Sequence, residues 1–160
     1  MGTHYKGRPA EVRALDAFIK LMRASRAMQG MLEKALTEHG LTEIQLGILE
    51  SLLHLGPMCQ RALGEKMLTS AANVTLVVDQ LEKRGWVKRE RSVEDRRFLS
   101  VSLTGEGKKF IEKVFPSHVS NITEAFQALT APEQEQLGEL CKQLGLSLKR
   151  RQDGKAEEGG

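Results

Sequence analysis

The sequence predicts a mainly α protein with one small β-hairpin, an α+β fold. Apolar residues recur at helical spacing through most of its 160 residues, 40% of which are hydrophobic. The segment LSVSL, residues 99–103, instead alternates apolar and polar residues, which is typical of a strand with one buried face. Because no linker or internal repeat interrupts the pattern, we expect a single domain over residues 10–148.

The periodicity assigns the elements in order. In the first helix, for example, Val12, Leu15 and Ile19 follow one another at spacings of three and four. The fifth helix contains Pro116, which is expected to kink or split it. The expected helices cover residues 10–38, 42–55, 60–67, 71–84, 104–129 and 131–148, and the expected hairpin has strands at 86–91 and 98–103 with its tip at 92–97.

Short polar residues and glycines predict where these helices begin and end. Thr42 and Gln45 have the spacing of a capping box, in which each side chain bonds the other residue's backbone. Ser70 and Thr104 are natural N-caps for the fourth and fifth helices. Gly85 directly follows the fourth helix, at the position where glycine commonly ends helices, and so predicts the end of this one.

Composition indicates the cellular setting. The formal charge is +3, the N-terminus has no apolar signal-peptide core, and no apolar run approaches the roughly 18 residues of a membrane span. The two cysteines, Cys59 and Cys141, lie far apart and are expected to be free thiols. We therefore expect a cytoplasmic protein without membrane contact. Residues 1–9 are expected to be flexible, and the charged, glycine-rich tail at 149–160 to be disordered.

The middle of the chain, residues 41–103, has the element order of a winged helix-turn-helix. In that arrangement the second helix of the pair enters the DNA major groove. On the outer face of the helix at 71–84, Asn73 can pair with adenine and Thr75 can bond a base edge or pack on a thymine methyl. Ser70 and the free N–H groups at the helix start suit a phosphate. For this helix alone, a capped helix with a solvated face is an equally good interpretation.

The hairpin at 86–103, here called the wing, strengthens the DNA-binding interpretation. Between Lys83 and Arg97 there are seven basic and three acidic residues, a local balance of +4 that exceeds the balance of the whole chain. Such a focus of positive charge is typical of a phosphate-binding surface. At the wing tip, Arg97 is assigned to the narrow minor groove, and Asp95, two residues away, to orienting its guanidinium. A simple surface ion pair is the alternative.

The residues that complete this pattern resemble the MarR family of bacterial transcription regulators. The similar stretches are residues 41–52 (LTEIQLGILESL), 60–97, which end in the Asp-Arg-Arg of the wing, and 101–110 (VSLTGEGKKF). The resemblance implies a homodimer held by dimerisation helices at 10–38 and 104–148. It also implies a repressor on a pseudo-palindromic operator, released by a small aromatic effector. The candidate DNA-contacting residues are Ser70, Ala71, Ala72, Asn73, Thr75, Leu76, Lys83, Arg91, Asp95, Arg96 and Arg97.

Other classes of function find less support in the sequence. No nucleophile motif or phosphate loop indicates an enzyme, no cofactor is expected, and the four scattered histidines predict no metal site. Cys59, near Arg61, is a candidate redox sensor, with a small buried apolar residue as the alternative. Two rivals remain for the wing and its helix: a module that binds a protein partner, and an architectural DNA binder without sequence preference.

Overall fold

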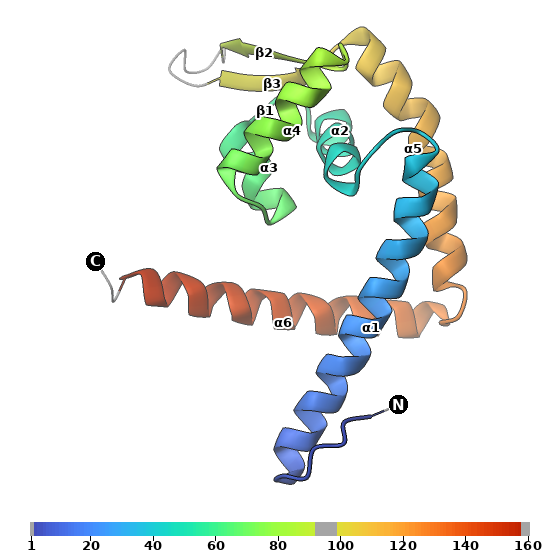
Figure 1. Ribbon diagram of the computed structural model, residues 1–160, viewed down its shortest axis with the longest axis vertical. Helices are drawn as coiled ribbons and strands as arrows, with labels where there is room; N and C mark the ends of the chain where they lie inside the picture. Colours follow the sequence, from blue (N-terminus) through green and yellow to red (C-terminus); the bar gives the residue numbers. More distant parts are fainter. Residues whose placement is uncertain (1, 92–98, 158–160) are drawn as a thin grey trace. The chain divides into compact units, whose positions relative to one another are not determined.

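The computed structural model describes residues 2–91 and 99–157, and of residues 152–157 it describes the backbone alone. The expected elements appear in the expected order (Figure 1). They are α1 (Pro9–Thr37), α2 (Glu43–Leu55), β1 (Met58–Cys59), α3 (Gln60–Met67), α4 (Ala71–Lys83), β2 (Val87–Arg91), β3 (Leu99–Leu103), α5 (Gly105–Phe126) and α6 (Ala131–Glu157). The chain forms two compact units, residues 1–121 and 122–160.

The first unit contains the core and the sheet. The three antiparallel strands lie in the order β1-β3-β2, so that Val101 of β3 pairs with Met58 on one side and Arg89 on the other. Below the sheet, α2, α3 and α4 supply most of the buried residues. The fully buried side chains include Ile48, Leu49, Leu63, Val74, Val78, Leu81, Val87, Val101 and Ile111. Within α4, Val74, Val77, Val78 and Leu81 form the buried face.

The predicted caps form as hydrogen bonds. Thr42 and Gln45 make both bonds of the capping box, and the Gln45 amide also donates to the Gln80 side chain at 2.9 Å, joining α2 to α4. The Ser70 hydroxyl accepts from the backbone N–H of Asn73, and the Thr104 hydroxyl from that of Gly107. Since each cap satisfies an otherwise unpaired N–H, the starts of α2, α4 and α5 are well determined by the sequence.

One short strand and the ends of two helices differ from the prediction. The two-residue strand β1 was not expected, because two residues carry no readable periodicity. The fifth helix is not split at Pro116, and as α5 it ends at Phe126 rather than at residue 129. The last helix does not end near Leu148, since α6 runs on to Glu157. Lysine, arginine, glutamine, alanine and glutamate dominate its final turns, and these are good helix formers.

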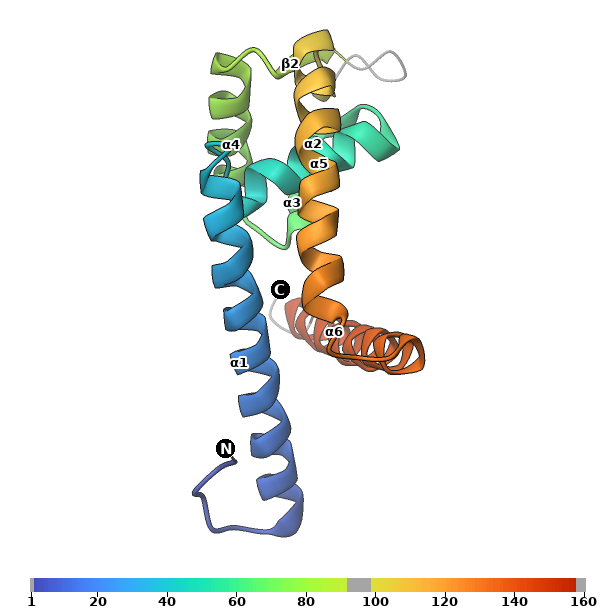
Figure 2. The same ribbon diagram turned by 90° about the vertical axis from the view of Figure 1, so that its right-hand side faces the viewer.

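The first helix, α1, is continuous from Pro9 to Thr37 (Figure 2), close to the predicted 10–38. Arg8 and Glu11 close its start, and the Arg8 side chain lowers the pKa of the Glu11 carboxyl. The residues before α1 also make contacts with this helix. The Thr3 N–H donates to Asp16, and the Tyr5 hydroxyl donates to Glu11.

The turn between α3 and α4 is unusually tight and contains one strained residue. A Cβ on Gly64 would lie 3.3 Å from the Thr69 carbonyl oxygen and 3.4 Å from Val74, so the two helices approach closely there. Leu68, which ends α3, adopts the left-handed conformation with φ 51° and ψ 42°. Its side chain is 92% exposed, so no buried contact offsets the strain.

We expect Leu68→Gly to raise the free energy of unfolding by about 1 kcal/mol, because glycine adopts a positive φ without strain. Urea denaturation measures the change. Leu55→Gly is the matched control, since Leu55 is also exposed, at 59%, but lies within α2. There the same substitution is expected to lower stability by about 0.5 kcal/mol. Equal losses at both positions would show that Leu68 is not strained.

Candidate nucleic-acid interface

The fourth helix, α4, has two distinct faces. Val74, Val77, Val78 and Leu81 are buried against the core at spacings of three and four. Ala71, Ala72, Thr75 and Leu76 are exposed on the other side. The helix is therefore fixed to the core by one face while its first two turns offer small and apolar groups to a partner.

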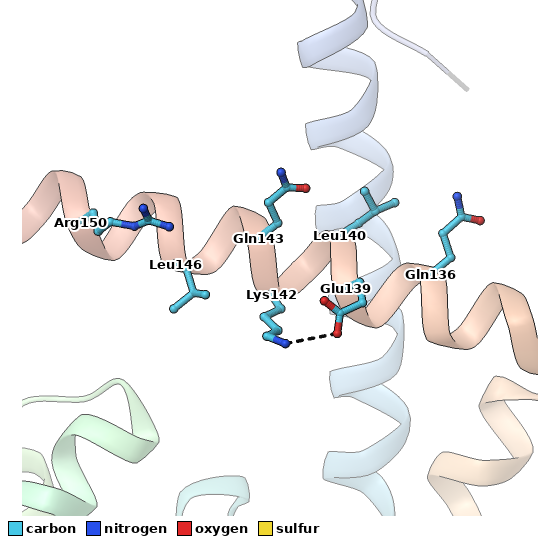
Figure 3. Close-up of a pocket in the computed structure, with 7 residues that line it drawn as sticks. All are labelled: Gln136, Glu139, Leu140, Lys142, Gln143, Leu146 and Arg150. Atoms are coloured by element: carbon cyan, nitrogen blue, oxygen red, sulfur yellow. Dashed lines mark hydrogen bonds and ion pairs between the residues drawn. The ribbon is translucent and has the colours of Figure 1, made fainter.

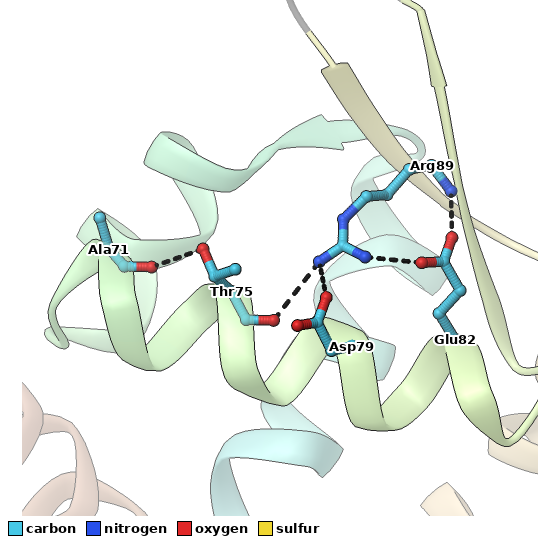
Figure 4. Close-up of polar contacts among 5 residues, drawn as sticks. All are labelled: Ala71, Thr75, Asp79, Glu82 and Arg89. Carbon is cyan, nitrogen blue, oxygen red and sulfur yellow. Dashed lines mark hydrogen bonds and ion pairs between the residues drawn. The ribbon is translucent and has the colours of Figure 1, made fainter.

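The polar residues predicted to read bases are engaged within the helix start. Asn73 is half-buried, and its amide nitrogen donates to the Thr69 hydroxyl at 2.9 Å. The Thr75 hydroxyl donates to the Ala71 carbonyl oxygen at 3.0 Å (Figure 4). This bond uses one of the two amide hydrogens of Asn73 and leaves its second hydrogen and its amide oxygen without a partner in the bond.

The sequence interpretation missed the residue that ties the wing to α4. Arg89, on β2, reaches across to α4 and contacts Asp79 at 2.5 Å and Glu82 at 2.6 Å, and it also bonds the Thr75 carbonyl oxygen at 3.4 Å (Figure 4). The Glu82 carboxylate accepts in addition from the Arg89 backbone N–H at 3.0 Å. The Arg89 side chain is only 18% exposed. We call Arg89, Asp79 and Glu82 the wing clamp.

A signal for the wing clamp was present in the sequence. Arg89 is two residues after the buried Val87, so in a strand both side chains point to the same face. Asp79 and Glu82 are three residues apart and so share one face of α4. A cation on the inner face of a strand needs a counter-charge, and these two carboxylates supply it.

Two of the basic side chains counted in the sequence are paired with carboxylates, and a third is held by other contacts. Arg89 belongs to the wing clamp, and Lys88 contacts Glu90 at 2.8 Å. Arg84 donates to the Gly40 carbonyl oxygen at 2.6 Å and stacks over Trp86 at 3.9 Å. Among the basic side chains described between residues 83 and 91, Lys83 and Arg91 form neither an ion pair nor a side-chain hydrogen bond, so they are the free cations of this stretch. Asp95, Arg96 and Arg97 lie outside the described residues.

The comparison with known proteins identifies the family. The sequence model of the MarR family matches residues 41–98, which include α2, α3, α4 and most of the wing. The HTH-type transcriptional regulator MhqR of Bacillus subtilis is 33% identical over 137 residues, which make up 86% of this chain and 94% of that protein. The chain belongs to the MarR family.

Solved structures agree with this assignment. A probable transcriptional regulator from Pseudomonas aeruginosa has 31% identity and a TM-score of 0.68, over 78% of this chain and 92% of that one. Sco3205 is a MarR family transcriptional regulator from Streptomyces coelicolor that was solved in complex with DNA. It has a TM-score of 0.80 at 24% identity, over 92% of this chain and 93% of that one, and this likeness shows the fold. The predicted mainly α winged-helix fold is thereby confirmed.

The structure also bears on the redox, metal and membrane predictions made for this MarR-family chain. Cys59 is a half-buried free thiol at the start of α3, and its basic neighbour Arg61 is paired with Glu65 at 3.1 Å. In the described ranges, no three histidine, cysteine or acidic residues gather as metal ligands would. No helix in the part of the chain that the structure describes is long and apolar enough to span a membrane.

Proposed function

We propose that this MarR-family protein is a sequence-specific DNA-binding regulator, a repressor, that binds a pseudo-palindromic operator as a homodimer. The observation that carries the proposal is the face of α4, which is exposed over its first two turns while the opposite face is fixed in the core. The wing clamp holds the wing against the same helix. Helix and wing can therefore meet a duplex as one rigid unit.

Each part of this unit has a role in the proposal. The exposed face of α4 enters the major groove, and the free N–H groups behind Ser70 face a phosphate. Lys83 and Arg91 neutralise phosphates on either side of the groove. At the wing tip, Arg97 enters the minor groove beside Arg96, with Asp95 orienting its guanidinium.

The exposed apolar residues of α1 and α6 support a second copy of this chain as partner. Phe18 of α1 is 58% exposed, and Leu15, Leu21 and Met31 also reach the surface. No residue between positions 131 and 151 of α6 is buried. Figure 3 shows Leu140 and Leu146 on this helix beside the Lys142–Glu139 ion pair, and all seven side chains drawn there come from α6 itself. Pairing of such faces removes apolar surface from water.

Two-fold symmetry would set the form of the operator. Two recognition helices related by a dimer axis fit half-sites about one DNA turn, roughly 34 Å, apart.

Sedimentation velocity tests the dimer, for which a particle of twice the 17.8 kDa chain mass is expected. A protein that sediments as a monomer at micromolar concentration would contradict it.

Selection from a random duplex pool at physiological salt tests the function itself. We expect enrichment of a pseudo-palindrome whose half-sites are spaced by about one turn. Salt-sensitive binding without any enriched sequence would instead indicate an architectural DNA binder. No binding at any salt concentration would indicate a module for a protein partner.

We expect Lys83→Gln and Arg91→Gln to weaken binding to every duplex by similar factors. Each substitution should also reduce the slope of log affinity against log salt concentration by about 2, because the homodimer loses one phosphate contact in each protomer. Fluorescence anisotropy titrations over a range of salt concentrations measure both quantities. Lys88→Gln is the control, since Lys88 is already paired with Glu90 and should change the slope less. Unchanged slopes for Lys83→Gln and Arg91→Gln would show that these two residues do not contact phosphate.

Release by a small aromatic effector is the remaining part of the proposal. An effector that binds one separation of the two lobes better than another would shift the dimer between them. A cavity of about 10 Å³ lies between the end of α1 and α5, lined in part by His39, Ser117 and His118. Burial lowers the pKa of His118, while Glu50 and Glu43 act to raise it. The cavity has room for about one water, so a phenol would bind there only after it opens.

A further inference from the structure

The surface that α4 presents to a duplex is poor in hydrogen-bond donors. The Asn73 amide donates to Thr69, and the Thr75 hydroxyl donates to Ala71. The exposed face of the first two turns is otherwise made of carbon, from Ala71, Ala72 and Leu76. These two turns contain no arginine or glutamine, which commonly read bases by donated hydrogen bonds, and the second amide hydrogen of Asn73 is their unused side-chain donor.

The same face contains an apolar strip. Ala72, Thr75 and Leu76 are spaced by three and four residues and so adjoin one another along the helix. Leu76 is 56% exposed, although α4 buries its other large aliphatic residues, Val74, Val77, Val78 and Leu81. A single exposed leucine needs no explanation, but this one forms the largest part of a strip at the proposed DNA surface.

The major groove offers one apolar group on its base edges, the C5-methyl group of thymine. We propose that Leu76, packed beside Ala72, contacts a thymine methyl group in each half-site and so determines which base pair is accepted there. The inference rests on the proposed function and deepens it, because it names the chemical group that α4 recognises. A base pair without the methyl group would leave Leu76 against a polar base edge, without its apolar contact.

Uracil substitution tests this inference, because uracil differs from thymine only in lacking the methyl group. Each thymine of the enriched duplex is replaced in turn by uracil, and affinities are measured for the wild-type protein and for Leu76→Ala. We expect one thymine in each half-site at which uracil weakens wild-type binding about three- to tenfold, the size of a lost buried methyl contact. Leu76→Ala removes the contact in both half-sites, so it should bind the thymine duplex more weakly by about the square of that factor, about ten- to a hundredfold, and be indifferent to uracil at that position.

The outcomes separate this inference from the function on which it rests. If the wild-type protein selects a duplex but tolerates uracil at every thymine, the methyl contact is wrong and the regulator proposal stands. If uracil weakens wild type and Leu76→Ala equally, the methyl group is read by another residue. If no duplex is selected, the proposed function itself fails. Leu55→Ala is the matched control, because Leu55 is similarly exposed but lies outside α4. It should leave the uracil profile unchanged.

Discussion

Replacement of Gly107 by alanine is expected to lower the free energy of unfolding by about 3 kcal/mol, a large effect for a single added methyl group. Gly107 is buried in the first turn of α5, and a Cβ there would lie 2.7 Å from the carbonyl carbon of Trp86 and nearly overlap its oxygen. Both atoms belong to the backbone, so no side-chain rotation relieves the clash. A thermal melt should show the midpoint falling by about 10 °C.

The surroundings of Gly107 explain why the backbone cannot yield. The Trp86 carbonyl accepts from the Thr104 N–H at 3.0 Å, and the Thr104 hydroxyl donates to the Gly85 carbonyl at 2.6 Å. The Trp86 ring stacks on Phe110 with ring centroids 3.8 Å apart. Displacement of α5 would break these contacts together, and they join the wing to the core.

Gly105→Ala is the matched control for this substitution. Gly105 also lies in the first turn of α5, but a Cβ there would have no atom within 4 Å. Alanine at that position should therefore raise stability by about 0.5 to 1 kcal/mol through its better helix propensity. If both variants unfolded at the same temperature, the close approach of α5 to Trp86 would be refuted.

Removal of the arginine of the wing clamp is expected to affect both stability and DNA affinity. Arg89→Gln leaves Asp79 and Glu82 without their counter-charge, and we expect it to lower the free energy of unfolding by about 2 kcal/mol. Two uncompensated carboxylates beside the duplex should also weaken binding about tenfold. The slope of log affinity against log salt should stay as in the wild type, because Arg89 itself neutralises no phosphate.

Two comparisons make the result on Arg89 specific. Arg61→Gln breaks an ion pair of the same type on α3, where both side chains are mostly exposed, and should cost no more than about 1 kcal/mol. In a double-mutant cycle, Arg89→Gln combined with Asp79→Asn should cost less than the sum of the two single changes. A salt slope reduced by about 2 in Arg89→Gln would mean that Arg89 of each protomer contacts phosphate and that the clamp opens on DNA.

The fold was predictable where local signals agreed. In α4, the cap at Ser70, the buried valines and the stop at Gly85 all indicate the same helix. The strand β1 was missed because its pairing comes from β3, more than forty residues away, and two residues show no pattern of their own. The end of α6 was misplaced because its composition suggested a tail, although its residues favour a helix.

The candidate site was predictable in position but not in its internal contacts. The exposed face of α4 followed from periodicity, since the buried positions leave only one other face. A charge count could not distinguish Arg89, which is held by Asp79 and Glu82, from Lys83, which is free. Nor could composition indicate that Asn73 is engaged with Thr69. Such contacts depend on which side chains the fold brings together.

Recognition of a DNA sequence by this protein is tested most directly by the ratio of two affinities. The enriched duplex and a shuffled duplex of the same composition are titrated with protein at physiological salt. We expect two protomers to bind the enriched duplex and the shuffled duplex to be bound at least about a thousandfold more weakly. Equal affinity for the two duplexes would contradict it.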